Sequence, residues 1–149
     1  MRIEALRDSP DAFSTRLEDA IKRPVNKTAE ILALKNAVTF GAFNAGKLLG
    51  NVKLVRNTAP KLEHRASVVA VYVTPIARGK GLARRLVVEL LQYAAKWQGL
   101  ERLDLMVASE NLPAIALYGH FGFEKYGTEI KSMKTPGKYI DEDLMVKFI

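Results

Sequence analysis

The sequence predicts a mixed α/β fold, and three observations carry that prediction. Apolar residues recur at helical spacing in two places, residues 10–34 and residues 82–97. Between them, residues 38–55 and 67–73 have the alternation and the valine content of strands. A glycine-containing turn at residues 78–83 joins a strand directly to a helix. Since the chain has 149 residues, 48% of them hydrophobic, we expect a single domain, residues 1–149, with a core of its own.

The first half of the chain is expected to hold two helices and three strands. Ser9 is a suitable N-cap and Pro10 a suitable first helical residue, so a helix is predicted from there to about Pro24. A short second helix, capped by Thr28, runs to Leu34. Strands follow at residues 38–43, 48–55 and 67–73, and the first two form a hairpin around the turn at residues 44–46.

The second half alternates helices with strands. Apolar residues from Leu82 to Trp97 mark one face of a long helix, and Gly99 ends it. A short buried strand is predicted at residues 103–107 and another helix at residues 113–119. Two strands close the chain on either side of a turn at residues 135–137, the first after residues 122–126 and the second at residues 144–148. This order of elements is typical of a mixed α/β domain.

Composition and charge argue against several classes of protein. The chain has no cysteine, which removes disulfides, thiolate zinc sites and cysteine nucleophiles. No apolar stretch approaches the ~18 residues of a membrane span. Residues 1–8 carry charges of both signs, unlike a signal peptide, so a cytoplasmic protein is expected. The net charge of +7 is dispersed and lacks interleaved aromatic residues, which favours an anionic small ligand over nucleic acid.

The segment from Val71 to Arg84 is typical of a phosphate-binding turn. An apolar strand ends at Pro75, and a basic, glycine-rich turn leads straight into a helix. Gly79 and Gly81 leave room for a phosphate to reach the backbone N–H groups at the helix start. The turn lacks the closing residues of a Walker A loop and the third glycine of a dinucleotide fingerprint. On these residues alone, a tight corner that binds nothing is an equal alternative.

Two blocks of the sequence resemble the GNAT superfamily of N-acetyltransferases. Arg78, Gly79, Gly81 and Ala83 are similar to its Q/R-x-x-G-x-G/A signature, and the strand before them ends in the matching Val-x-Pro. Residues 111–123 resemble its second block, N-x-x-A-x-x-L-Y-x-x-x-G-F. Together the blocks cover about the central third of the chain. The resemblance implies a mixed, mostly antiparallel sheet with a central, splayed pair of parallel strands, flanked by about four helices.

The resemblance also implies acetyl-CoA as co-substrate and no metal. The pyrophosphate would lie on the backbone amides of residues 79–83, and the pantetheine arm would pair with the backbone of Val71 and Val73. Asn111 would bind the pantetheine or order a water, and its alternative is a plain helix N-cap. The implied cofactor-binding residues are Val71, Val73, Arg78, Gly79, Lys80, Gly81, Leu82, Ala83, Arg84 and Asn111, with Arg85 as a further candidate.

Tyr118 matches the family's general acid, whose hydroxyl would protonate the departing CoA sulfur. The alternative is a half-buried helix aromatic with a hydrogen-bonded tip. The backbone N–H of Val73 would hold the thioester oxygen as charge develops. The base is less defined, because residues 67–73 contain no carboxylate. Candidates are Glu63, His64 and Asp104, together with proton loss through ordered water.

The predicted reaction moves an acetyl group from CoA to a primary amine of a small molecule or peptide, by direct attack in a ternary complex. A non-catalytic acyl-CoA-binding or interaction domain of the same fold is the alternative. Acceptor selectivity is expected from the first helices, the loop after Val55 and the hairpin around Pro136. Residues that could present a polar or acidic group to a cationic amine are Glu18, Tyr139, Asp141 and Glu142.

The start of the chain departs from the family pattern. The family fold begins with a strand ahead of the first helix, and no such strand is predicted here. Either that strand is lost, or the true start lies upstream, or this copy is short. Residues 38–43 would then form a free sheet edge, and free edges recruit partners. We therefore expect a homodimer through that edge, or completion of the sheet by a strand from another chain.

Overall fold

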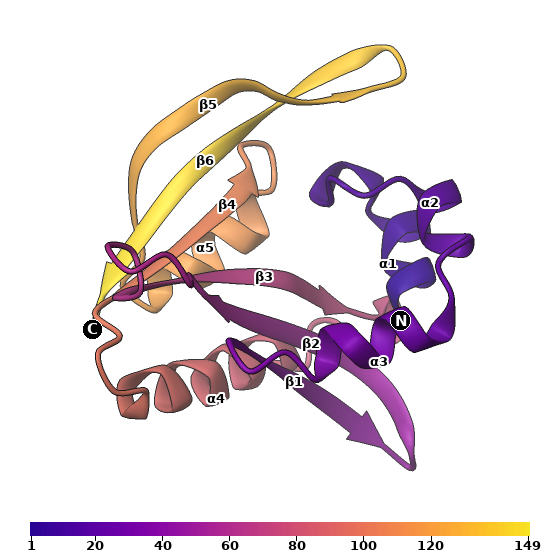
Figure 1. The fold of residues 1–149 in the computed structure, drawn as a ribbon. Helices are drawn as coiled ribbons and strands as arrows, with labels where there is room; N and C mark the ends of the chain where they lie inside the picture. The colour runs from indigo at the N-terminus through magenta and orange to yellow at the C-terminus, as the bar shows by residue number, and fades with distance from the viewer.

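A computed structural model describes every residue from Met1 to Ile149. Six strands form one sheet in the order β1-β2-β3-β4-β6-β5, and only the β3–β4 pair is parallel (Figure 1). The strands are β1 (Ala37–Asn44), β2 (Lys47–Arg56), β3 (Arg65–Val73), β4 (Arg102–Ala108), β5 (Glu124–Thr135) and β6 (Lys138–Phe148). The helices are α1 (Arg2–Asp8), α2 (Leu17–Ile21), α3 (Val25–Leu32), α4 (Leu82–Lys96) and α5 (Leu112–His120). The predicted fold class is confirmed.

Helices α4 and α5 cover one face of the sheet and form the core with it. Leu86, Leu90 and Ala94 recur every four residues along α4 and are almost fully buried. They belong to one apolar cluster with the buried residues of β2, β3 and β4, and with Tyr118 of α5. The longest helix, α4, has 15 residues, and no helix combines the length and the hydropathy needed to cross a bilayer.

The N-terminal region differs from its prediction. The continuous helix expected from Pro10 to Pro24 is absent, and a 3₁₀ turn at Pro10–Ala12 and the five-residue α2 take its place. Phe13 is extended and interrupts any helix there. Helix α1 was not predicted, and α3 begins directly after Pro24 rather than at Thr28, because proline without an N–H ends α2 and starts a new helix. As predicted, no strand precedes β1.

The last two strands form a long hairpin that stands out from the sheet (Figure 1). The strand predicted at residues 144–148 is only the final part of β6. Asp143 of β6 is buried, and its carboxylate pairs with Lys125 of the same hairpin at 2.8 Å. The carboxylate also accepts a hydrogen bond from the Ser109 hydroxyl at 2.6 Å, which links the hairpin to the loop after β4. Lys125 first, then Ser109, hold the pKa of Asp143 below its ordinary value. The start of α5 is thereby fixed against the sheet.

Candidate functional site

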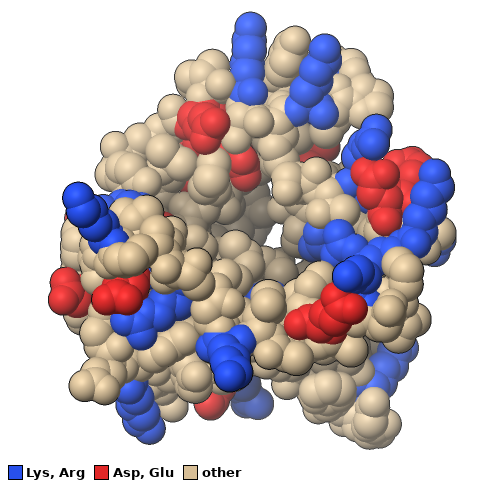
Figure 2. Space-filling model, viewed as in Figure 1, with Lys and Arg blue, Asp and Glu red and all other residues tan.

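The parallel strands β3 and β4 separate along their length and leave a cleft. They pair only where residues 65–67 lie opposite residues 102–104, and beyond that point their backbones diverge. The cleft holds a cavity of about 410 Å³, and Figure 2 shows the molecule hollowed between the sheet and the N-terminal segment. The cavity is lined by residues 68–73 and 106–108, by Ser9, Ala12, Phe13, Arg78 and Ala83, and by Asn111, Pro113, Ala114, Leu117 and Tyr118.

A bulge in β3 bends the strand away from its neighbour. Asn51 pairs with Tyr72 and Lys53 pairs with Val69. Two residues of β3, Ala70 and Val71, therefore lie opposite the single residue of β2 between Asn51 and Lys53. Ala70 takes a left-handed conformation with φ of 54°, which is unfavourable for alanine. The Asn51 side chain donates to the Ala70 carbonyl at 2.6 Å, within the sheet, and so satisfies a group that the bulge removes from the ladder. Asn51 therefore holds the bulge in place.

Beyond the bulge, β3 directs backbone groups into the cleft. The N–H of Thr74 donates to the Leu49 carbonyl, and Tyr72 is registered opposite Asn51, so these residues bond toward β2. The intervening Val71 and Val73 therefore present their N–H and C=O groups to the other edge, where β4 has turned away. The Val73 carbonyl accepts from Arg78 Nε at 3.0 Å.

The glycine turn lies at the end of the same strand. Gly79 and Gly81 have φ of 72° and 74°, conformations that side chains rarely adopt, and open space surrounds the position of a Cβ at each. The first helical hydrogen bond runs from Arg85 N–H to the Gly81 carbonyl at 3.1 Å. The amides of Leu82, Ala83 and Arg84 precede that bond, so no helical carbonyl uses them. The turn thus offers a set of free N–H groups at a helix N-terminus.

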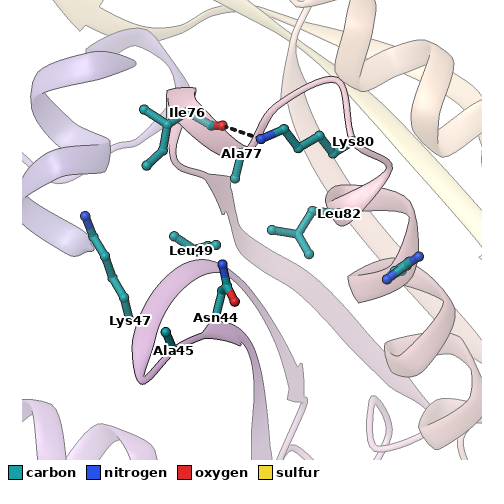
Figure 3. A pocket seen from close by; sticks show the side chains of 9 residues that line it. Asn44, Ala45, Lys47, Leu49, Ile76, Ala77, Lys80 and Leu82 are labelled. Atoms are coloured by element: carbon teal, nitrogen blue, oxygen red, sulfur yellow. Dashed lines mark hydrogen bonds between the residues drawn. The ribbon is translucent and has the colours of Figure 1, made fainter.

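The basic side chains of the turn have separate surroundings. Arg78 forms an ion pair with Asp8 of α1, so its guanidinium joins the turn to the N-terminal segment. Arg84 contacts His120 of α5. Lys80 donates to the Ile76 carbonyl at 3.2 Å beside a second cavity of about 560 Å³, shown in Figure 3, which Arg85 also lines. None of these three contacts was predicted, and those of Arg78 and Arg84 join the turn to distant segments of the chain.

Two buried tyrosines border the cleft, and only one has a free hydroxyl. Tyr72 donates to Glu4 of α1 at 3.4 Å. Tyr118 is 6% exposed and its ring lies edge-on to Phe123, yet its hydroxyl has no partner in the chain and is not sealed from the cavity. Burial raises the pKa of Tyr118 to about 12. The Tyr118 hydroxyl therefore stays protonated and available to a ligand.

Asn111 is the N-cap of α5, which is one of the two roles that the sequence predicts for it. Its side-chain oxygen accepts from the Ala114 N–H at 3.3 Å. The same side chain lines the cleft, and its amide nitrogen donates to nothing in the chain. Asn111 is therefore both a structural cap and a free donor at the cleft.

The candidate bases are dispersed. Another cavity lies on the face of the sheet opposite α4 and α5, and we call it the open-face cavity. Glu63 and His64 lie before β3 and line neither the cleft nor this cavity. Asp104 lines the open-face cavity but is held by Arg65 at 3.1 Å and Arg102 at 2.7 Å. Of the acceptor candidates, Glu142 lines the open-face cavity, Tyr139 and Asp141 line another beside the Pro10 turn, and Glu18 is exposed on α2.

Comparison with known proteins finds a matching family model and several similar proteins. A family model described as "Acetyltransferase (GNAT) family" matches residues 3–123. An L-amino acid N-acetyltransferase of Escherichia coli is 28% identical over 102 residues, which are 68% of this chain and 62% of that protein. The chain thus spans less than two thirds of that relative's length.

Two solved structures resemble the fold closely. One is an acetyltransferase of the GNAT family from Streptococcus pneumoniae, with a TM-score of 0.84, 27% identity, and coverage of 97% of this chain and 89% of that one. The other, from Salmonella typhimurium, was solved with its cofactor acetyl-CoA. It has a TM-score of 0.84 at 21% identity and covers 99% of this chain and 83% of that one.

Proposed function

The chain belongs to the acetyltransferase (GNAT) family, and from this we propose that it is an acetyl-CoA-dependent N-acetyltransferase. The acceptor is a primary amine of a small molecule or peptide, which attacks directly in a ternary complex. One observation carries the proposal: a single cleft runs between the glycine turn, with its free amides, and the unpartnered hydroxyl of Tyr118.

The residues of the cleft fit acetyl-CoA. Free N–H groups at the start of α4 suit its pyrophosphate, because a helix N-terminus favours an anion and the two glycines allow close approach. Lys80 and Arg84 add positive charge beside the turn, whereas the charge of Arg78 is paired with Asp8. The amide-containing pantetheine arm suits the cleft-facing backbone of Val71 and Val73 and the free amide of Asn111.

When bound, acetyl-CoA supplies a thioester that a neutral amine can attack. The cleft-facing Val73 N–H would stabilise the oxygen of that thioester as it gains charge. Tyr118, with a pKa of about 12, would donate a hydrogen bond to the departing sulfur. Full proton transfer from Tyr118 to a thiolate, whose acid has a pKa near ~8.5, is uphill by roughly 5 kcal/mol, so the departing thiolate would take its proton from solvent. The proton lost by the amine would pass to Glu142, the carboxylate of the open-face cavity without a cationic partner.

The proposal is tested with thermal unfolding and an assay of thiol release. CoA is expected to raise the melting temperature, and acetyl-CoA with a suitable amine is expected to release free thiol and an acetylated product identified by mass. Stabilisation by CoA without turnover on a broad amine panel would favour a non-catalytic acyl-CoA-binding domain. Absence of both responses contradicts the proposal.

We also propose a homodimer formed through β1. This strand pairs only with β2 and leaves its outer backbone edge without a partner, and Phe43 near its end is 67% exposed. Light scattering at assay concentration is expected to give twice the chain mass of 16.6 kDa. A mass of one chain rejects the dimer.

A further inference from the structure

The open-face cavity lies on the acceptor side of the cleft. It has a volume of about 600 Å³ and is built on the face of the sheet opposite α4 and α5. It meets the cleft at shared lining residues, which are Ala12, Phe13, Val68, Val69, Ala70 and Met106. A molecule in this cavity is therefore separated from the cleft only by the splayed strands.

Arg2 lines this cavity as a cation without an anion. Its guanidinium donates to the Thr15 hydroxyl at 2.7 Å and lies 5.2 Å over the ring of Phe13, and no carboxylate pairs with it. Arg2 is an exposed residue that is partly desolvated by its neighbours, and this desolvation first, and the nearby charge of Arg23 second, lower its pKa. Because a guanidinium has five N–H donors and Arg2 uses one, several donors remain for a ligand. An anion bound there would compensate the positive charge of the Arg2 guanidinium.

Among the other charged groups around the cavity, one carboxylate has no cationic partner. Arg65 and Arg102 share the one carboxylate of Asp104, so that group is already neutralised. Glu142 accepts a hydrogen bond from Ser132 at 2.6 Å but has no cationic partner. It is registered opposite Ala108, a residue of the cleft wall. An ammonium beside Glu142 would therefore lie near the cleft.

Apart from Ser14 and Ser67, the remaining residues that line the cavity are apolar or aromatic. Val69, Met106 and Tyr126 are 40%, 48% and 54% exposed although they line it, and Leu144 and Met133 also line it. Exposed apolar surface inside a cavity favours a ligand with an apolar side chain. A polyamine fits less well, since it would bring further positive charge to Arg2 and Arg65.

From these observations we infer that the acceptor is an amine that also carries a carboxylate and an apolar side chain, such as an apolar amino acid, with its carboxylate on Arg2 and its amine beside Glu142. The inference rests on the proposed function, because it names the acceptor of the same reaction. It predicts that removing the carboxylate from the acceptor and removing the guanidinium from the protein weaken acceptor binding to the same extent.

The test compares L-leucine with 3-methylbutylamine, which has the same side chain and no carboxylate, and with spermidine. Calorimetric titration in the presence of CoA measures affinity without turnover, and thiol release from acetyl-CoA measures kcat/KM. Wild-type protein is expected to prefer leucine over 3-methylbutylamine by at least about tenfold. In Arg2→Gln that preference falls to near unity through weaker leucine binding, whereas 3-methylbutylamine is unaffected, and Arg2→Lys is intermediate.

Arg7→Gln is the matched control, because it removes one positive charge from the same helix at an exposed position outside the cavity. It is expected to keep the wild-type preference. An unchanged leucine preference in Arg2→Gln, or a wild-type preference for 3-methylbutylamine or spermidine, overturns the inference while turnover upholds the proposed function. Failure of the proposed function is seen separately, as absence of both CoA stabilisation and turnover. Melting temperatures of all variants in CoA verify that each is folded.

Discussion

Tyr118→Phe is expected to lower kcat by about two orders of magnitude and to leave the affinity for acetyl-CoA nearly unchanged. The substitution removes only the hydroxyl, which lines the cleft and has no partner in the chain, so the fold loses no hydrogen bond. The ring remains packed against Phe123 in the core. Steady-state thiol release gives kcat, and calorimetric titration with CoA gives the affinity.

The pH profile separates Tyr118 from the groups that titrate near neutrality. Because burial holds its pKa at about 12, Tyr118 stays protonated between pH 6 and pH 9. The profile of kcat in that range is therefore expected to keep its shape in Tyr118→Phe while the whole curve falls. Tyr93→Phe is the control, since Tyr93 is a helix tyrosine of α4, 42% exposed and outside the cleft. Wild-type kcat in Tyr118→Phe would remove the hydroxyl from the reaction.

Asn51→Leu is expected to lower kcat by about one to two orders of magnitude, although Asn51 does not line the cleft. Leucine has a similar volume but cannot donate to the Ala70 carbonyl, so the left-handed conformation at Ala70 loses its support. The bulge then relaxes, and the cleft-facing N–H groups of Val71 and Val73 move from the positions proposed for binding the pantetheine arm and the thioester oxygen. The cost in stability is smaller, about 1 kcal/mol.

A second substitution should restore the bulge. Glycine adopts a positive φ without strain, so Ala70→Gly is expected to recover most of the lost kcat in the Asn51→Leu background. Asn36→Leu is the matched control, because the Asn36 side chain also donates to a backbone carbonyl, in this case that of Arg56 in β2, at 2.9 Å and outside the cleft. It should cost similar stability with unchanged kcat. Equal kinetic loss in both asparagine variants would show that only stability was disturbed.

The parts of the fold that the sequence predicts are those with local causes. The apolar period of α4, the glycines at positions 79 and 81 and the cap at Asn111 act over a few residues, and the structure has each element where these signals put it. The splay of β3 and β4 followed from the family resemblance and not from spacing, since nothing within either strand encodes where their pairing ends.

The parts that were missed depend on contacts between distant residues. Helix α1 has seven residues, too few to be stable alone, and it is held by Glu4 on Thr74 and by Asp8 on Arg78. The left-handed position of the bulge is Ala70 and not a glycine, and its stabilising group, Asn51, lies on the neighbouring strand β2. Arg2 gave no signal either, as its importance depends on the absence of a carboxylate around it in the fold.

The two cavities that meet across the splayed strands have a practical consequence for inhibition. Since they share a wall at residues 68–70, a molecule that joins CoA to an amino carboxylate through its sulfur would fill both at once. Its second half would then bind at the effective concentration set by the linker, rather than from free solution. The proposed arrangement of donor and acceptor thus predicts that one chemically linked ligand blocks both cavities tightly.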